Sequence, residues 1–185
     1  PDVTLVGVLN ADCALNMPDF RSSEKTFQLI TQVSGRAGRG ENPGRVIVQT
    51  YNPEHYSVIL GAKQDYISFY ESEKRFRNEL FYPPFSKITL VRIIGKDSKK
   101  VAVRAKEFAK MINDIKTKFN FDSEFQILGP APCPISKIKE KERWQIMIKA
   151  KNYSDLHLLF TEIEKNIKRR EKEIEIRIDF DPQNF

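Results

Sequence analysis

The stretch Val3-Thr4-Leu5-Val6-Gly7-Val8-Leu9 is a nearly unbroken apolar run near the start of the 185-residue chain. Such a run predicts a strand buried on both faces, as in parallel α/β sheets. After it, the sequence predicts a loop from Asn10 to about Phe20, a helix over residues 21–34 and a strand over residues 45–50. Strand, helix and strand in this order indicate an α/β fold. Because two strands do not complete a sheet, we expect these residues to be the end of a larger lobe.

An amphipathic pattern over residues 53–80 predicts one long helix. It stops at Tyr82-Pro83-Pro84-Phe85, because tandem prolines cannot continue a helix. We therefore place a domain boundary here, with a first domain over residues 1–80 and a second over residues 81–185.

The second domain has an α+β pattern of its own. The sequence predicts the order β-α-β-β-α-β, a split βαβ arrangement with two helices on one face of the sheet. The segment over residues 129–134, which is rich in proline, predicts a rigid, irregular connection after the second strand. The expected strands are residues 87–95, 125–128, 143–150 and 174–180, and the expected helices are residues 99–119 and 153–170.

Composition indicates a soluble cytoplasmic protein. The sequence has no apolar run long enough to span a bilayer and no signal-peptide pattern at its start. Cys13 and Cys133 lie far apart without metal-ligand spacing, so we expect reduced packing residues and no bound metal. The first 80 residues hold nine Lys and Arg against ten Asp and Glu, whereas the remainder holds 22 against 15. This basic excess favours an anionic partner such as nucleic acid, although solvated lysines are also common on soluble domains.

The chemically informative segment is Gln32-Val33-Ser34-Gly35-Arg36-Ala37-Gly38-Arg39-Gly40, which follows the first predicted helix. It lacks the Lys-Ser/Thr of a Walker A loop, and its glycine spacing is not that of a dinucleotide fingerprint. Glycines allow a tight turn, and planar guanidinium groups suit phosphate oxygens. The segment therefore predicts arginines that reach a phosphate held elsewhere. The alternative is a glycine-rich surface turn with solvated arginines.

The pattern Q-x-x-G-R-x-G-R resembles motif VI of superfamily 2 helicases. Further stretches narrow the resemblance to the PriA family of primosomal replication-restart DNA helicases, and the similarity covers essentially the whole chain. These stretches are Leu9-Asn10-Ala11-Asp12, Asp19-Phe20-Arg21-Ser22-Ser23-Glu24, Thr50-Tyr51-Asn52-Pro53-Glu54-His55, Tyr82-Pro83-Pro84-Phe85, Gly129-Pro130, Arg143-Trp144-Gln145-Ile146 and Asp179-Phe180-Asp181-Pro182.

The resemblance implies specific roles. The first domain is expected to be the C-terminal part of a RecA-like helicase lobe 2, with parallel strands and helices. Arg39 is expected to be the arginine finger and Arg36 a second contact to the γ-phosphate of ATP. Gln32, with Gly35 and Gly38, would couple the nucleotide to lobe movement. Asp12 either touches nucleotide or positions the motif, although a simple loop or capping role is equally compatible with the sequence.

The same resemblance places the remaining ATP machinery outside this sequence. In the family, the phosphate-binding loop, the acidic motif for magnesium and the zinc-binding cysteines precede the region that this chain matches. We therefore expect the isolated chain neither to hydrolyse ATP nor to bind zinc, whereas the full-length protein would use ATP, magnesium and zinc.

A basic stripe in the second domain suits nucleic acid. Trp144 lies among Lys137, Lys139, Lys141 and Arg143. Cations can neutralise phosphates while an aromatic ring stacks on a base. Alternatively, Trp144 anchors the core and the cations form a solvated hairpin.

Two functional hypotheses follow. The first is a C-terminal fragment of an ATP-dependent 3′-to-5′ helicase that binds branched DNA and restarts stalled replication forks by primosome assembly. Its partners would be forked or single-stranded DNA, single-stranded-DNA-binding protein and other primosome proteins. The second is a non-enzymatic basic module that binds nucleic acid or another partner. The tail of an RNA helicase is a third possibility that the later stretches disfavour.

Overall fold

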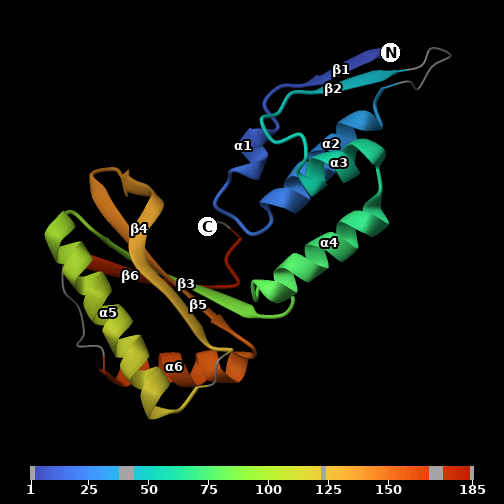
Figure 1. Ribbon diagram of the computed structural model, residues 1–185. Helices are drawn as coiled ribbons and strands as arrows, with labels where there is room; N and C mark the ends of the chain where they lie inside the picture. Colours follow the sequence, from blue (N-terminus) through green and yellow to red (C-terminus); the bar gives the residue numbers. More distant parts are fainter. Residues whose placement is uncertain (1–2, 38–43, 122–123, 167–172, 184–185) are drawn as a thin grey trace. The chain divides into compact units, whose positions relative to one another are not determined.

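The computed structural model of the chain describes residues 3–37, 44–121, 124–166 and 173–183. The chain divides into two compact units, Pro1–Glu79 and Leu80–Phe185. Both are mixed α/β, because the first has a two-stranded parallel sheet with helices and the second a four-stranded antiparallel sheet with helices. Figure 1 shows the elements of each unit in chain order.

The first unit contains a short parallel sheet and four helices. Strands β1 and β2 pair in parallel, with Val6 opposite Val46. The aromatic rings of Phe27 and Phe69 stack with centroids 4.1 Å apart and join two of the helices. The elements are β1 (Leu5–Val8), α1 (Asp12–Leu15), α2 (Ser22–Ser34), β2 (Arg45–Val48), α3 (Tyr56–Lys63) and α4 (Tyr66–Glu79).

Three sequence predictions for this unit were wrong in detail. The first strand was expected to be buried on both faces, but side chains of β1 are exposed, including Leu5 at 59%. The expected loop over residues 10–20 contains the four-residue helix α1. The expected single helix over residues 53–80 is two helices, because Gln64 adopts a left-handed conformation with φ 54° and ψ 29°. Asp65 then accepts a hydrogen bond from the backbone N–H of Ser68 and caps the start of α4. An aspartate three residues before a serine is a local signal for this restart.

The second unit has the element order that its sequence predicts. Its strands lie in the order β4-β5-β3-β6, and each neighbouring pair is antiparallel. Helix α5 begins after Asp97, whose carboxylate accepts hydrogen bonds from the backbone N–H groups of Lys99 and Lys100. The elements are β3 (Lys87–Gly95), α5 (Ser98–Lys118), β4 (Gln126–Ile138), β5 (Lys141–Ala150), α6 (Tyr153–Asn166) and β6 (Ile174–Phe180). The expected end of the last helix, residues 167–170, lies outside the described residues.

Both helices pack on one face of this sheet (Figure 1), as the sequence predicts. Alternate residues of β3 and β5 point to the same side of the sheet. Val91, Ile93, Ile146 and Ile148 join a single apolar cluster with residues of both helices, including Phe108. The intervening residues of β3 and β5 therefore point to the opposite face of the sheet.

The expected irregular segment over residues 129–134 is instead part of strand β4. This strand pairs with β5 from Gln126 to Ile138, with register shifts between Leu128 and Ala131 and between Pro132 and Lys137. Prolines are tolerated here because β4 is an edge strand of the sheet and its outer N–H groups need no partner strand. The sequence signal for irregularity was therefore correct, but it marks bulges rather than the end of pairing.

Candidate functional site

The C-terminal end of α2 carries the described part of the arginine-rich segment. The helix ends at Gly35, whose N–H donates to the carbonyl of Thr31 at 3.1 Å. Gln32 and Arg36 are both exposed at this end. Gly38 and Arg39 lie outside the described residues, so the placement of the expected finger is not part of this structure. The end of α2 therefore presents an amide and a guanidinium to any anion that approaches it.

Asp12 is buried and holds a turn of the backbone after β2. Its carboxylate accepts from the N–H of Tyr51 at 2.9 Å, from Nδ2 of Asn52 at 2.7 Å and from Oγ1 of Thr50 at 3.1 Å. The hydrogen bond from Tyr51, followed by those from Asn52 and Thr50, lowers the pKa of this carboxyl despite its burial. These contacts support a positioning role for Asp12 and explain why the stretch at residues 50–52 suits this fold.

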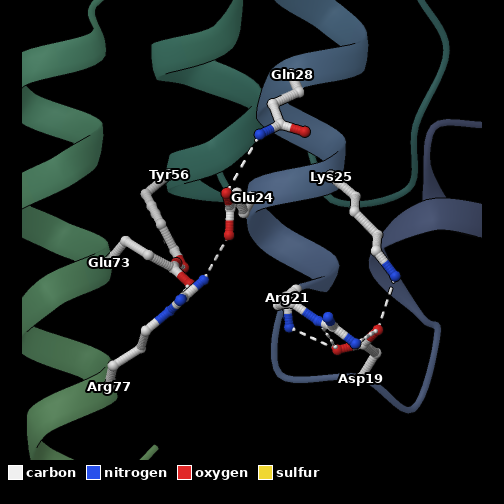
Figure 2. Close-up of polar contacts among 8 residues, drawn as sticks. All are labelled: Asp19, Arg21, Glu24, Lys25, Gln28, Tyr56, Glu73 and Arg77. Carbon is white, nitrogen blue, oxygen red and sulfur yellow. Dashed lines mark hydrogen bonds and ion pairs between the residues drawn. The ribbon is translucent and has the colours of Figure 1, made fainter. Parts of the chain in front are cut away.

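Ion pairs of Asp19 stabilise the loop that leads into α2. Asp19 accepts hydrogen bonds from Nε of Arg21 at 3.0 Å and from Nζ of Lys25 at 2.7 Å (Figure 2). Burial raises the pKa of Asp19, but the hydrogen bonds from Arg21 and Lys25 outweigh it and lower the pKa to about 2. The N-terminal end of α2 is thus held by an ionised aspartate.

In the second unit, the predicted basic residues lie on the hairpin of β4 and β5. Lys139 and Glu140 form its two-residue turn with φ of 48° and 58°, as in a type I′ hairpin. Lys137 forms an ion pair with Glu140 at 2.9 Å, and Lys141 lies 3.8 Å from Glu175. The hydrogen bond to Glu140 raises the pKa of Lys137. Carboxylates therefore already accompany two of the predicted cations.

The structure separates Trp144 from Arg143. Trp144 is half-buried and packs against the apolar cluster beneath the helices. Its neighbour Arg143 points to the other face of the sheet, because successive side chains of a strand alternate. This placement supports the interpretation of Trp144 as a core anchor, and the ring does not share a surface with Arg143.

Two arginines that the sequence analysis missed lie on the same face as Arg143. Arg92 of β3 lies opposite Arg177 of β6, and on its other side it lies opposite Gln145. Arg92 also forms an ion pair with Asp179 at 3.4 Å. Burial raises the pKa of the Cys133 thiol, and the nearby charges of Arg143 and Arg92 oppose that rise. The helix-free face of the sheet therefore gathers three guanidinium groups from three strands.

Like charges directly opposite one another destabilise a pair of strands. An arginine inside an otherwise apolar strand was the available sequence signal for Arg92, and the alternation of β6 was the signal for Arg177. Their pairing could not be inferred without the register of β3 and β6.

Within residues 3–37, 44–121, 124–166 and 173–183, no group of His, Cys, Asp or Glu side chains is arranged to hold a metal ion. None of the helices in this same part of the chain is both long and apolar enough to cross a membrane.

Comparisons with known proteins match both units. The family model described as the primosomal protein N C-terminal domain matches residues 78–183. The replication restart protein PriA of Bacillus subtilis is 47% identical over 184 residues, which are 98% of this chain and 22% of that protein. PriA of Synechocystis is 42% identical over 80% of this chain and 17% of its own length, and PriA of Borreliella burgdorferi is 33% identical over 98% and 26%. The chain thus spans about a sixth to a quarter of the length of these relatives.

Proposed function

This chain belongs to the PriA family of replication restart proteins, and we propose that it acts as the C-terminal part of an ATP-dependent 3′-to-5′ DNA helicase. The helicase would bind branched DNA and restart stalled replication forks by primosome assembly in the bacterial cytoplasm. The observation that carries the proposal is the 47% identity to a replication restart protein over 98% of the chain, which includes the arginine-rich segment as well as the second unit. Single-stranded-DNA-binding protein and other primosome proteins would be its partners.

The first unit would be the C-terminal part of the second RecA-like lobe, residues 1–80. Exposed apolar side chains on its short sheet, including Leu5 at 59% and Ile47 at 49% exposure, are compatible with a sheet that continues in a larger protein. ATP and magnesium would be held mainly by residues outside this chain. Arg36, at the end of α2, and Arg39 of the same sequence motif would stabilise negative charge on the γ-phosphate, and Gln32 would couple the nucleotide to lobe movement.

Arginine fingers accelerate phosphoryl transfer by about 10³- to 10⁵-fold. In the complete protein, Arg39→Ala should therefore lower DNA-stimulated ATP turnover by at least about 10³-fold, and Arg36→Ala should also lower it. Binding of ATP, measured separately by equilibrium titration, should remain within a few-fold. Arg75→Ala is the matched control, because Arg75 is an exposed arginine in α4.

Unchanged turnover in both motif variants would remove the assigned role of the segment. The chain would then be better described by the second hypothesis, a non-enzymatic nucleic-acid-binding module.

For the second unit, residues 81–185, we propose DNA contact through the helix-free face of the sheet and the adjoining hairpin. Arg92, Arg143 and Arg177 would bind the phosphates, and the hairpin cations Lys137, Lys139 and Lys141 would extend the contact. Arg92 and Arg177 form ion pairs with Asp179 at 3.4 Å and with Glu175 at 2.6 Å. Their adjacency across β3 and β6 supports this assignment, because one phosphate could accept hydrogen bonds from both guanidinium groups. Trp144 is retained as a residue of the core beneath this face.

The double variant Arg92→Gln/Arg177→Gln should weaken binding of forked DNA about tenfold or more. The slope of log K against log salt concentration should fall in magnitude by about two, which corresponds to the loss of about two phosphate contacts. Fluorescence anisotropy at several salt concentrations measures both quantities. Lys110→Gln in α5 is the control, since α5 covers the opposite face. Equal losses in the control and the double variant, or binding that does not respond to salt, would reject this surface.

A further inference from the structure

Four polar side chains form a hydrogen-bonded network across three helices of the first unit. Oη of Tyr56 in α3 donates to Oε2 of Glu73 in α4 at 2.6 Å. Nε of Arg77 in α4 donates to Oε1 of Glu73 at 2.7 Å, and its Nη2 donates to Oε2 of Glu24 in α2 at 2.7 Å (Figure 2).

Arg77 joins α4 to α2 through its ion pair with Glu24. Its side chain is 17% exposed and that of Glu73 is 10% exposed, so the ion pair is shielded from most solvent. Burial lowers the pKa of Arg77, but the hydrogen bonds to Glu24 and Glu73 have the larger combined effect and raise the pKa above its usual value. A guanidinium offers several donors in one plane and can serve two carboxylates at once, whereas an ammonium group lacks this fixed geometry.

Arg77 also reaches the loop that precedes α2. Its guanidinium lies 5.0 Å from the centre of the Phe20 ring, and that of Arg21 lies 5.2 Å from the same ring. Arg21 is in turn bound to Asp19 at 3.0 Å. The contacts of Arg77 therefore hold both the first turn of α2 and the residue that leads into it.

An apolar contact also joins α2 to α4. Phe27 of α2 stacks on Phe69 of α4 with an interplanar angle of 14°. On α3, a Cβ added at Gly61 would lie 3.1 Å from Cβ of Ile30, so α2 and α3 are in close contact. With a polar and an apolar attachment to α4, α2 can change its direction only if α4 moves with it.

We propose that Arg77 is a positioning residue that fixes the direction of α2 and thereby the placement of Gln32 and Arg36 at the opposite end of that helix. The inference rests on the proposed role of Gln32 and Arg36 in the ATP cycle. Helix α4 ends at Glu79 and the second unit begins at Leu80, so α4 is also the element through which the chain enters the proposed DNA-binding unit. These contacts would therefore join the N-terminal end of α2, the helix that carries Gln32 and Arg36 at its other end, to the element that precedes the second unit.

The test compares Arg77→Lys and Arg77→Gln in the complete protein with Arg75→Gln. Arg75 is a matched control, because it lies in the same helix but its side chain is 67% exposed. Its ion pair with Glu79 is long, with Nε 3.9 Å from Oε1. A displacement of about 1 Å can cost about 10²-fold in rate. Both Arg77 variants should therefore lower the DNA-stimulated kcat about tenfold or more, with KM for ATP within about threefold and with unchanged circular dichroism at the assay temperature.

Glu24→Gln provides a second, milder variant, because the side chain of Glu24 is 37% exposed. If Arg77 acts through Glu24, the double variant Glu24→Gln/Arg77→Gln should be no slower than the slower of the two single variants. Simple loss of stability would lower the melting temperature of these variants without producing this non-additive effect on kcat.

A folded Arg77→Lys or Glu24→Gln protein with the kcat of the unmodified protein would overturn the positioning role. A separate measurement on Arg36→Ala distinguishes failure of the proposed function. If Arg36→Ala and Arg39→Ala keep full turnover, the role of α2 in ATP hydrolysis is lost whatever Arg77 does. If they lose turnover while the Arg77 variants keep it, the positioning inference alone fails.

Discussion

The two units hold their helices in place by different forces. Among the described residues, the first unit has six buried apolar side chains and the second has nineteen. The helices of the first unit are joined by a network of ion pairs and hydrogen bonds, whereas those of the second unit share one apolar cluster with the sheet. The first unit therefore depends on the charges and the geometry of a few polar groups, and the second depends on how well its core is filled.

This difference matches the proposed division of function. An element that must reposition arginines benefits from directional contacts, because hydrogen bonds and ion pairs fix angles as well as distances. A unit that offers a surface to DNA needs a rigid sheet, which close packing supplies. Substitutions that remove volume should therefore damage the second unit most, and substitutions that remove charge should damage the first.

The largest expected effect on stability is a cavity in the second unit. Phe108 of α5 is fully buried in the apolar cluster. Phe108→Ala should lower the free energy of unfolding of this unit by about 3–5 kcal/mol. Urea unfolding of the 185-residue chain measures the loss, with Val103→Ala as the control because Val103 is 55% exposed in the same helix. A loss below about 1 kcal/mol would show that the core tolerates a cavity and that the contrast between the units is weaker.

A smaller effect is expected from a charge in the first unit. Asp19 has a pKa lowered to about 2 from a usual 3.8, and its side chain is 6% exposed. Its ionised form should therefore stabilise this unit by about 2 kcal/mol. Because the pKa is lower in the folded state, this contribution is present above about pH 4 and is lost as the pH falls toward 2.

Thermal unfolding of Asp19→Asn between pH 7 and pH 2 tests this sign. The variant should be less stable at pH 7, and the difference from the unmodified chain should vanish near pH 2. Asp114→Asn, at an exposed aspartate of α5, is the control. A difference that grows as the pH falls would contradict the assigned ion pairs.

The smallest expected effect compares two buried threonines, one in each unit, for which the same substitution should have opposite signs. Oγ1 of Thr89 in β3 is buried without a hydrogen-bond partner, whereas Oγ1 of the buried Thr26 in α2 donates to the carbonyl of Ser22 at 2.9 Å. Thr89→Val should be neutral or stabilising by up to about 1 kcal/mol, and Thr26→Val should cost about 1 kcal/mol. Denaturant midpoints compare the two, and equal losses would mean that Thr89 has a role outside packing.

Much of the second unit could be predicted from the sequence because its signals are local. The period of two over residues 174–180 and the helical spacing of residues such as Val101, Phe108 and Ile115 identify elements that the structure confirms. The position of β6 at the edge of the sheet could not be predicted from local periodicity, because it depends on the order of the strands. Ile178 and Phe180 remain 39% and 49% exposed, since no strand or helix covers the end of β6 fully among the described residues.

The candidate sites depended on contacts distant in sequence. Glu73 and Arg77 are four residues apart and could be paired from the sequence, but Glu24 lies 53 residues from Arg77. The arginines of the sheet face come from three strands and meet only through the register. The sequence located the arginine-rich segment and the basic hairpin, but it could not show that Trp144 points away from Arg143.

The most direct test of the division between the units is a crossed measurement on the complete protein. DNA-stimulated kcat and the Kd for forked DNA would be determined for Arg36→Ala and for Arg92→Gln/Arg177→Gln. The first variant should lose turnover at saturating DNA with an unchanged Kd, and the second should lose affinity with a largely preserved kcat. If either variant lowers both quantities equally, or if the two effects are exchanged, the assignment of nucleotide coupling to one unit and DNA contact to the other is contradicted.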